Sequence, residues 1–290
     1  MELLSEYKNG NYSVKLYSDG TKELFTDDNE FIAEFPDSID LKITNYCELN
    51  CPMCHEKSTT RGAHANLNEP FIGALHAGTE LAIGGGNPFS HPELETFLRR
   101  LKEQGVIANI TINEKHLERY KSVIEKFIAE KLIYGLGISL STYEDRTFKF
   151  AREYPNAVFH VICGVADLKK LLKKGGKEYK LLVLGYKRKG RGEEYFSDDI
   201  KEKMLEFDRL LPRLCAKYGI VSFDNLAIKQ LSVKERVPSA VWEERFMGND
   251  GQNTMYVDLV KKEFAVSSTS SNRYPLLGSI EEMFEKVRIK

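Results

Sequence analysis

The chain has 290 residues, of which 42% are hydrophobic and 29% charged, and its formal net charge is −1. This length is sufficient for one principal domain with a large core and a smaller attachment. A charge near zero excludes a general attraction to polyanions, no apolar stretch approaches the roughly 20 residues that span a bilayer, and no signal-peptide pattern opens the sequence. We therefore expect a cytoplasmic protein with no membrane partner.

The N-terminal segment has a pattern of its own. Apolar and polar residues alternate over residues 12–25 around Asp19-Gly20. This combination is typical of a β-hairpin. We predict an N-terminal β-hairpin appendage over residues 1–38.

Three cysteines follow a short apolar strand that we expect over residues 39–44. Cys47, Cys51 and Cys54 have the spacing C-x-x-x-C-x-x-C. Three thiolates on one loop hold three corners of a 4Fe-4S cluster and leave the fourth iron open to a small molecule. Zinc with His55 as a fourth ligand is one alternative, but no second arm of paired ligands is present. Disulfides are another, although three cysteines are an odd set in a chain with no secretion signal.

A glycine run follows the second apolar strand, which we expect over residues 80–84. The run and the residue after it are Gly84, Gly85, Gly86 and Asn87. Glycine allows a positive φ and a close approach of the backbone to a ligand, although a glycine cluster alone is typical of a turn. At the end of a strand beside the cysteine loop, the run is a candidate ligand-binding segment.

Strands and helices alternate over the next hundred residues. We expect a helix over 69–78, a capping box at Ser90–Glu93 that opens a helix closed by Gly105, and a long helix over 114–131. Further strands are expected over the apolar runs 106–112, 136–140, 157–163 and 179–186. Six strands alternating with helices imply an α/β protein with a parallel sheet, which is either doubly wound or curved into part of a barrel.

In both architectures ligands bind at the carboxyl ends of the strands. Besides the cysteines and glycines, the candidates at these ends are Asn113, Ser139, Ser141, Cys163, Gly164, Tyr186 and Lys187. Lys187 also begins a basic run that continues through Arg188, Lys189 and Arg191 and is spaced by glycine. The run is either a solvated charged face or a site for phosphate or carboxylate.

The C-terminal part changes pattern again. After a helix expected over 198–217, residues 253–272 predict a hairpin around Lys261-Lys262, and Ser279 opens a final helix through a capping box. We treat residues 220–290 as a small C-terminal α+β extension. Cys163 and Cys215 are expected to be buried as small hydrophobic residues.

The cysteine spacing resembles the signature of the radical S-adenosylmethionine (radical SAM) family, and the glycine run stands where that family has a Gly-Gly-Glu type motif. The resemblance covers about residues 40–190. It implies a partial (β/α)6 TIM-like barrel with parallel strands over residues 39–219, a 4Fe-4S cluster on the three cysteines, and S-adenosyl-L-methionine beside it. The residues implied for binding S-adenosyl-L-methionine are Met53, Gly84, Gly85, Gly86, Asn87, Ser139, Ser141 and Gly164.

Three features depart from the family pattern. Met53 replaces an aromatic residue, and as an adaptable apolar side chain it can fill the same space. Asn87 replaces the carboxylate of the glycine motif, and its amide oxygen can still accept a hydrogen bond from an ammonium group. The C-terminal hairpin and helix resemble a SPASM or twitch extension, but residues 216–290 contain no cysteine for an auxiliary cluster.

For activity, the resemblance implies that a reduced cluster transfers one electron to S-adenosylmethionine and that the resulting 5′-deoxyadenosyl radical removes a hydrogen atom from the substrate. An electron donor such as flavodoxin or ferredoxin is the implied partner. We expect a peptide or amino-acid side chain as substrate, with candidate contacts from Asn113, Tyr186, Lys187 and Arg188. One alternative is a nucleotide or nucleic acid bound through the basic run. The other is a non-catalytic metal-binding or sensing protein.

Overall fold

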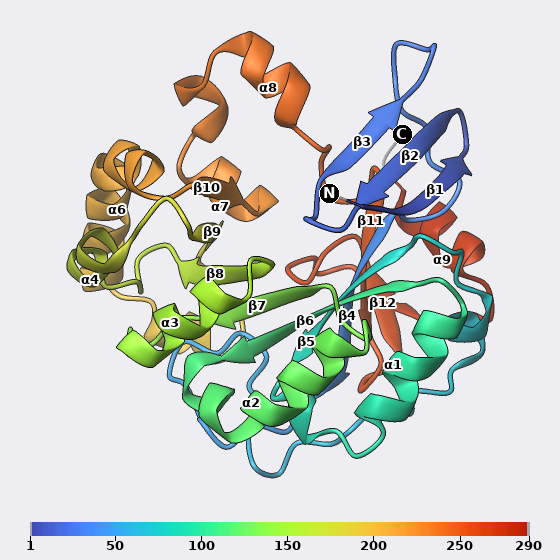
Figure 1. Cartoon of the computed structure of the whole chain (residues 1–290), viewed down its shortest axis with the longest axis horizontal. Helices are drawn as coiled ribbons and strands as arrows, with labels where there is room; N and C mark the ends of the chain where they lie inside the picture. Colours follow the sequence, from blue (N-terminus) through green and yellow to red (C-terminus); the bar gives the residue numbers. More distant parts are fainter. Residues whose placement is uncertain (1, 289–290) are drawn as a thin grey trace.

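The N-terminal segment forms a small antiparallel sheet. In the computed structural model, which describes residues 2–288, β1 (Leu3–Asn9), β2 (Tyr12–Tyr17) and β3 (Lys22–Phe25) pair in that order (Figure 1). The hairpin predicted around Asp19-Gly20 is β2 and β3, with Leu16 opposite Lys22 and Gly20 at a φ of 89°. Strand β1 pairs with the other edge of β2. The predicted hairpin is therefore part of a three-stranded sheet.

Asp37 joins this small sheet to the rest of the protein. Its buried carboxylate accepts hydrogen bonds from Tyr7 Oη at 3.0 Å, Asn9 Nδ2 at 2.8 Å and Tyr12 Oη at 2.7 Å. Burial raises the pKa of both tyrosines, and the negative charge of Asp37 raises it further. Because Asp37 directly precedes the first strand of the main sheet, these bonds fix the small sheet at the amino end of that strand.

A ten-stranded sheet forms the centre of the fold. Its order is β10-β9-β8-β7-β6-β5-β4-β11-β12-β13, and all neighbours from β10 to β11 are parallel. The strand bounds are β4 (Ser38–Thr44), β5 (Glu80–Gly85), β6 (Ile107–Asn113), β7 (Gly135–Ser139), β8 (Ala157–Ile162), β9 (Lys180–Leu184), β10 (Ile220–Phe223), β11 (Thr254–Asp258), β12 (Glu263–Ala265) and β13 (Tyr274–Pro275). The six predicted strands are β4 to β9, which confirms an α/β protein with a large parallel sheet. Within residues 2–288, β10 and β13 do not pair with each other, so the sheet is open.

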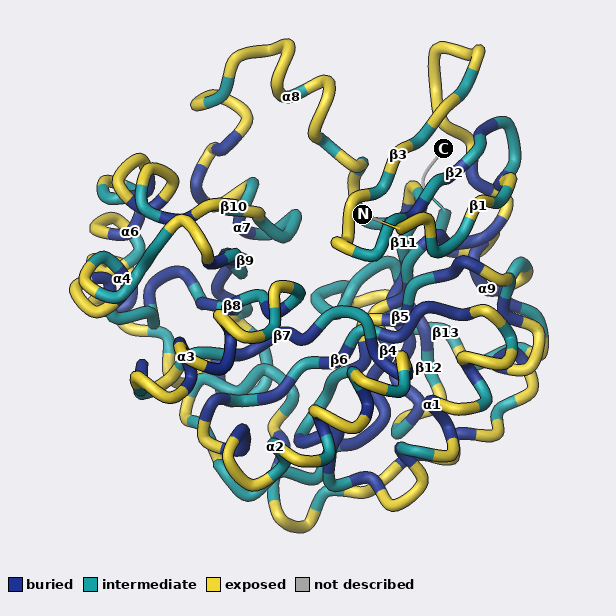
Figure 2. Tube along the Cα trace, in the orientation of Figure 1, coloured by how far each residue is buried: buried dark blue, intermediate teal, exposed yellow. Residues whose placement is uncertain are grey.

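The helices of residues 2–288 are α1 (Leu94–Glu103), α2 (Glu114–Ala129), α3 (Asp145–Glu153), α4 (Leu168–Lys174), α5 (Arg191–Tyr195), α6 (Asp198–Lys217), α7 (Asn225–Gln230), α8 (Ser239–Arg245) and α9 (Ile280–Val287), with short 3-10 turns η1 (Pro70–Ala74), η2 (Pro88–Ser90) and η3 (Val233–Arg236). Helices α1, α2, α3 and α6 lie along the outer face of the sheet, whereas α8 stands apart from it (Figure 1). On β4 the outward residues Ile39, Leu41 and Ile43 are almost fully buried. In Figure 2 the central strands β4 to β9 are mostly buried or intermediate, while the helices are exposed on their solvent side. The hydrophobic core thus lies between the sheet and the helices.

Two predicted helices differ from the structure. The segment 69–78 forms only the 3-10 turn η1, which ends where the backbone of Leu75 becomes extended. Ser90 does not form a capping box, because its hydroxyl donates to the carbonyl oxygen of Asn87 at 2.6 Å and α1 begins only at Leu94. Pro92 explains the delay, since a residue that precedes proline, here His91, is held extended.

The C-terminal residues extend the main sheet at two places. Strand β10 pairs with β9, and β11 lies beside β4 with Val257 opposite Leu41. The hairpin predicted around Lys261-Lys262 is formed by β11 and β12. Ser279 accepts a hydrogen bond from the N–H of Glu282 and caps α9 as predicted. The boundaries at residues 38 and 219 stay predictions.

Two further expectations concern burial and membranes. Cys163 is buried as expected, whereas Cys215 is exposed on α6, so the prediction for Cys215 is wrong. In residues 2–288, every helix is too short or too polar to cross a bilayer.

Candidate functional site

The cysteine loop follows β4 and is folded back on itself by backbone hydrogen bonds. The N–H of Cys47 donates to Thr59 O at 2.9 Å, and the N–H of Thr59 donates to Asn45 O at 3.2 Å. Asn50 and Lys57 adopt left-handed backbone conformations, with φ of 46° and 52°, which tighten the loop between the cysteines and after them. Cys47, Cys51 and Cys54 are all half-buried.

The three thiols lie close enough to influence one another. Burial raises the pKa of Cys47 and Cys51, and the negative charges of the neighbouring thiolates raise it further. Lys115 and Arg191 act in the opposite direction on Cys51. Closely spaced thiolates that repel one another are stabilised by binding a cation or a cationic cluster.

The side chains around the cysteine loop are not gathered into the set that the zinc alternative requires. In residues 2–288, the ligand atoms that all lie within 4.8 Å of one another are those of Cys47, Glu48 and His116, and the three sulfurs do not form such a group. His55, the fourth ligand of the zinc alternative, instead lies 3.2 Å from Glu56. This arrangement gives the zinc alternative no support.

The glycine run packs against the cysteine loop. The N–H of Gly86 donates to Thr44 O at 2.8 Å, and the N–H of Asn87 donates to Tyr46 O at 2.7 Å. A Cβ on Gly85 or Gly86 would lie 2.3 Å from Thr44 O or 2.1 Å from Tyr46 O, and Gly85 also has a φ of 112°. Gly84 is different, because a Cβ there would have no atom within 4 Å. Packing thus requires glycine at positions 85 and 86, whereas Gly84 leaves open space beside the backbone.

Asn87, three residues after Gly84 in sequence, has an unused acceptor. The side chain is 1% exposed, and Nδ2 donates weakly to Tyr120 Oη at 3.4 Å. Its Oδ1 has no hydrogen-bond partner in the described part of the chain. A buried acceptor without a donor costs about 1–3 kcal/mol, so a ligand that brings an ammonium group would relieve this cost.

Residues at the ends of β6 to β8 have mixed surroundings. Asn113 caps α2 by accepting from the N–H of Lys115 at 3.0 Å, and Ser141 Oγ donates to Asn113 Oδ1 at 3.3 Å. Ser139 is half-exposed, and its hydroxyl makes no hydrogen bond within residues 2–288. Gly164 faces Met204 and Ile200 of α6, with a φ of 83°. Of these residues, Ser139 has the side chain that is free to meet a ligand.

Glu114 organises the loop after β7, which the sequence did not predict. Its buried carboxylate accepts hydrogen bonds of 2.6–2.9 Å from the backbone N–H groups of residues 141–144 and one of 3.0 Å from Thr147 Oγ1. Burial opposes ionisation, but the backbone donors outweigh it and hold the pKa of Glu114 below its usual range. An acidic residue directly after the cap Asn113 is the one local signal for this role.

The basic run after β9 is used inside the protein. Lys187 Nζ donates to Ser268 Oγ at 2.9 Å, and Lys189 Nζ donates to Ser270 O at 2.8 Å. Arg191 donates to Cys51 O at 2.9 Å and to Ser58 O at 3.0 Å. The remaining cation, Arg188, pairs with Glu193 at 2.9 Å and lies over the ring of Phe196. Tyr186 is buried too, and its hydroxyl donates to Gly192 O at 2.8 Å.

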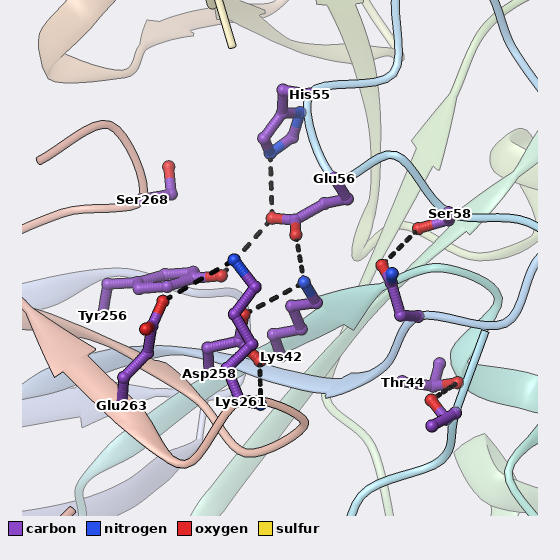
Figure 3. Close-up of polar contacts among 12 residues, drawn as sticks. Lys42, Thr44, His55, Glu56, Ser58, Tyr256, Asp258, Lys261, Glu263 and Ser268 are labelled. Atoms are coloured by element: carbon purple, nitrogen blue, oxygen red, sulfur yellow. Dashed lines mark hydrogen bonds and ion pairs between the residues drawn. The ribbon is translucent and has the colours of Figure 1, made fainter. Parts of the chain in front are cut away.

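A buried ion network that the sequence did not predict lies at the end of the cysteine loop, where Glu56 follows Cys54 by two residues (Figure 3). Lys42 Nζ is 2.5 Å from Glu56 Oε2 and 3.0 Å from Asp258 Oδ2, and its side chain is 4% exposed. Burial opposes ionisation of Glu56, but His55 and Lys42 outweigh it and hold the pKa of Glu56 well below its usual range. Tyr256 adds a weak hydrogen bond to Glu56 at 3.4 Å. Lys42, as the lysine within the mostly apolar strand IDLKIT, was the sequence feature that could have indicated this network.

Comparison with known proteins gives a match in structure. No protein-family model matches the chain, and no curated protein matches it in sequence. The crystal structure of Streptococcus suis SuiB bound to the precursor peptide SuiA is 14% identical, covers 80% of this chain and has a TM-score of 0.54. The structure of SuiB bound to S-adenosylmethionine is 15% identical, covers 88% of this chain and has a TM-score of 0.53. The alignments span 60% and 64% of the SuiB chain, and they show that this protein has the same fold.

Proposed function

We propose that this protein is a radical SAM enzyme, with a 4Fe-4S cluster on Cys47, Cys51 and Cys54. The observation that carries the proposal is the direct hydrogen bonding between the segment of the glycine run and the strand end and loop that carry three half-buried thiols. Such a cluster, when bound, supplies an electron to S-adenosylmethionine. The shared fold with SuiB, which was crystallised with S-adenosylmethionine, supports the proposal.

The residues of this chain would hold the second cofactor at the same sheet edge. Gly84 leaves room for a ligand against the backbone, and the unpartnered Oδ1 of Asn87 would accept from its amino group. The free hydroxyl of Ser139 would bond to its polar groups, and Met53 on the cysteine loop would supply an apolar contact. Gly85, Gly86, Ser141 and Gly164 would act through backbone shape, because their surroundings are filled by protein atoms.

For the substrate, we propose a peptide or an amino-acid side chain, with flavodoxin or ferredoxin as electron donor. The peptide-bound SuiB structure supports this class. A nucleic acid is less favoured, because Lys187, Lys189 and Arg191 are bonded within the protein. The expected substrate contacts of Tyr186, Lys187 and Arg188 stay predictions, as does that of Asn113.

The test is anaerobic reconstitution with iron and sulfide, followed by dithionite and S-adenosylmethionine. Iron and sulfide content report on cluster loading, and chromatography reports on 5′-deoxyadenosine. The control is the triple variant C47A/C51A/C54A. Cluster and product from the intact protein alone would support the proposal. A full cluster without product would overturn it in favour of a metal-binding or sensing protein.

A further inference from the structure

A chamber of about 320 Å³ lies against the inner face of the main sheet, apart from the cysteine loop and the glycine run. Inward-facing residues of β5 to β10 line it, and the β2–β3 turn of the small sheet forms its opposite side. The lining residues used below are Leu16, Asn109, Thr111, Val158, His160 and Leu182. This volume suits one side chain or a small molecule of similar size.

The β2–β3 turn is bonded across the chamber to the sheet. Asn156 Nδ2 donates to Ser18 O at 2.7 Å, and Lys180 Nζ donates to Asp19 O at 3.1 Å. These bonds join the small sheet to the amino ends of β8 and β9. The turn therefore closes the end of the chamber that is distant from the cysteine loop.

The charged groups of the lining balance one another in sign. Glu80 forms an ion pair with Lys22, and Lys180 Nζ donates to the carbonyl oxygen of Asp19. The N–H of Thr21, which donates to the Asp19 carboxylate at 3.1 Å, lowers the pKa of that carboxyl, and the charge of Lys180 lowers it further. A charged ligand would upset this balance, and burying an unpaired charge is costly.

Uncharged polar groups, in contrast, face the chamber without partners. A Cβ on Gly137 would lie 2.3 Å from Cε1 of His160 and 2.9 Å from Oγ1 of Thr111, so these two side chains meet over the glycine. Neither the ring of His160 nor the hydroxyl of Thr111 makes a hydrogen bond within residues 2–288. Burial lowers the pKa of His160 to about 4, so the ring is neutral at pH 7 and offers one donor and one acceptor. Asn109 uses Oδ1 on the N–H of Gly135 and keeps its amide donors free.

We propose that this chamber binds an uncharged, hydrogen-bonding group with an apolar frame, such as a phenol or carboxamide side chain of the substrate, and that His160 determines this specificity. Leu16, Val158 and Leu182 provide the apolar wall. The next inward residues along β6 and β7 are Asn113 and Ser139, at the edge where the glycine run lies. The assignment of the bound group to the substrate rests on the proposed function, whereas the binding chemistry does not.

The test uses the full chain without iron, sulfide or S-adenosylmethionine, so cluster failure cannot affect it. The neutral probes p-cresol and propanamide are compared with the matched anions p-toluate and propanoate by titration, with proton NMR of the histidine rings as the readout. We expect each neutral probe to bind at least tenfold more tightly than its anion and to shift the His160 resonance. Equal binding of neutral and anionic probes, or no shift of His160, would overturn the proposal.

The variant His160→Phe keeps a ring and removes the hydrogen bonds. We expect it to bind p-cresol at least tenfold more weakly, while the matched variant His76→Phe, outside the chamber, binds as the wild type does. Unchanged binding by His160→Phe would contradict the role of His160. If His160→Phe does not fold, Thr111→Val gives the second test, with an expected loss of about threefold or more.

Discussion

Arg191 Nε donates to the carbonyl oxygen of Cys51 at 2.9 Å, although 140 residues separate the two in sequence. The N–H of Arg191 donates to Cys54 O at 3.0 Å, and a second guanidinium nitrogen donates to Ser58 O at 3.0 Å. One residue of the basic run therefore holds both sides of the cysteine loop. Through Arg191, the basic run after β9 stabilises the cysteine loop.

Arg191→Gln should weaken retention of the cluster without unfolding the protein. The shorter, uncharged amide cannot reach Cys51 O and Ser58 O together, so the loop loses at least one of these hydrogen bonds and the charge of the donor. We expect reconstituted Arg191→Gln to release iron to a chelator several-fold faster than wild type, followed by absorbance. Arg188→Gln is the matched control, because Arg188 is exposed and forms its ion pair with Glu193 of α5. Equal release rates in the two variants would refute the supporting role.

Glu114→Gln should destabilise the protein by about 2–4 kcal/mol at pH 7, since a neutral amide has a single acceptor oxygen for the five donors that the carboxylate accepts. The native pKa of Glu114 is below that of the unfolded chain, so its contribution is present above the unfolded pKa and is lost as pH falls through the native one. In urea unfolding, the difference in free energy of unfolding between wild type and Glu114→Gln should become smaller as the pH is lowered. Glu118→Gln, on the exposed face of α2, should leave stability within about 0.5 kcal/mol of wild type.

Lys42→Met should cost about 3–5 kcal/mol, because Glu56 and Asp258 are then left buried without their cation. Adding Glu56→Gln removes one of the two uncompensated charges. The double variant should therefore lose less than the sum of the single variants, by about 1 kcal/mol or more. The free energies of unfolding of wild type, the two single variants and the double variant are measured in denaturant. If the losses of the single variants add up to that of the double variant, Lys42 and Glu56 are not coupled.

Gly86→Ala and Gly84→Ala should separate packing from ligand binding. A methyl group on Gly86 would meet Tyr46 O, so we expect loss of stability by about 2 kcal/mol or more in thermal unfolding. A methyl group on Gly84 has free space and should leave stability unchanged. We expect Gly84→Ala to bind S-adenosylmethionine at least tenfold more weakly in equilibrium dialysis of the reconstituted protein. Wild-type binding by Gly84→Ala would place the ligand elsewhere.

Local patterns predicted the parts of the fold that depend on neighbours in sequence. The apolar runs gave β4 to β9 within one or two residues, and Ser279 gave the start of α9, because burial and capping act over a few residues. The partners of Lys42 could not be predicted in this way. Asp258 reaches Lys42 only because β11 pairs with β4, and pairing between distant strands leaves no mark on either strand alone.

The same limit applies to the candidate site. The spacing of Cys47, Cys51 and Cys54 identified the loop, but the basic run was ambiguous, because a lysine or arginine does not reveal whether it faces solvent or a carbonyl oxygen. Glu114 was likewise hidden, since four of its donors come from a loop more than 25 residues away. His160 lies in the apolar run 157–163, and that run alone does not reveal that Gly137 of the neighbouring strand leaves room for the imidazole ring.

The position of β11 also bears on how the protein is made. Glu56 and Tyr256 are 200 residues apart, and at about 5–20 residues per second a ribosome needs roughly 10 to 40 s to pass from one to the other. During that interval the cysteine loop has been synthesised, but the strand carrying Tyr256 and Asp258 has not. Buried Lys42 then has one of its two carboxylate partners, Glu56, but not the other, Asp258. Metal delivery to the thiols should accordingly follow the synthesis and pairing of β11.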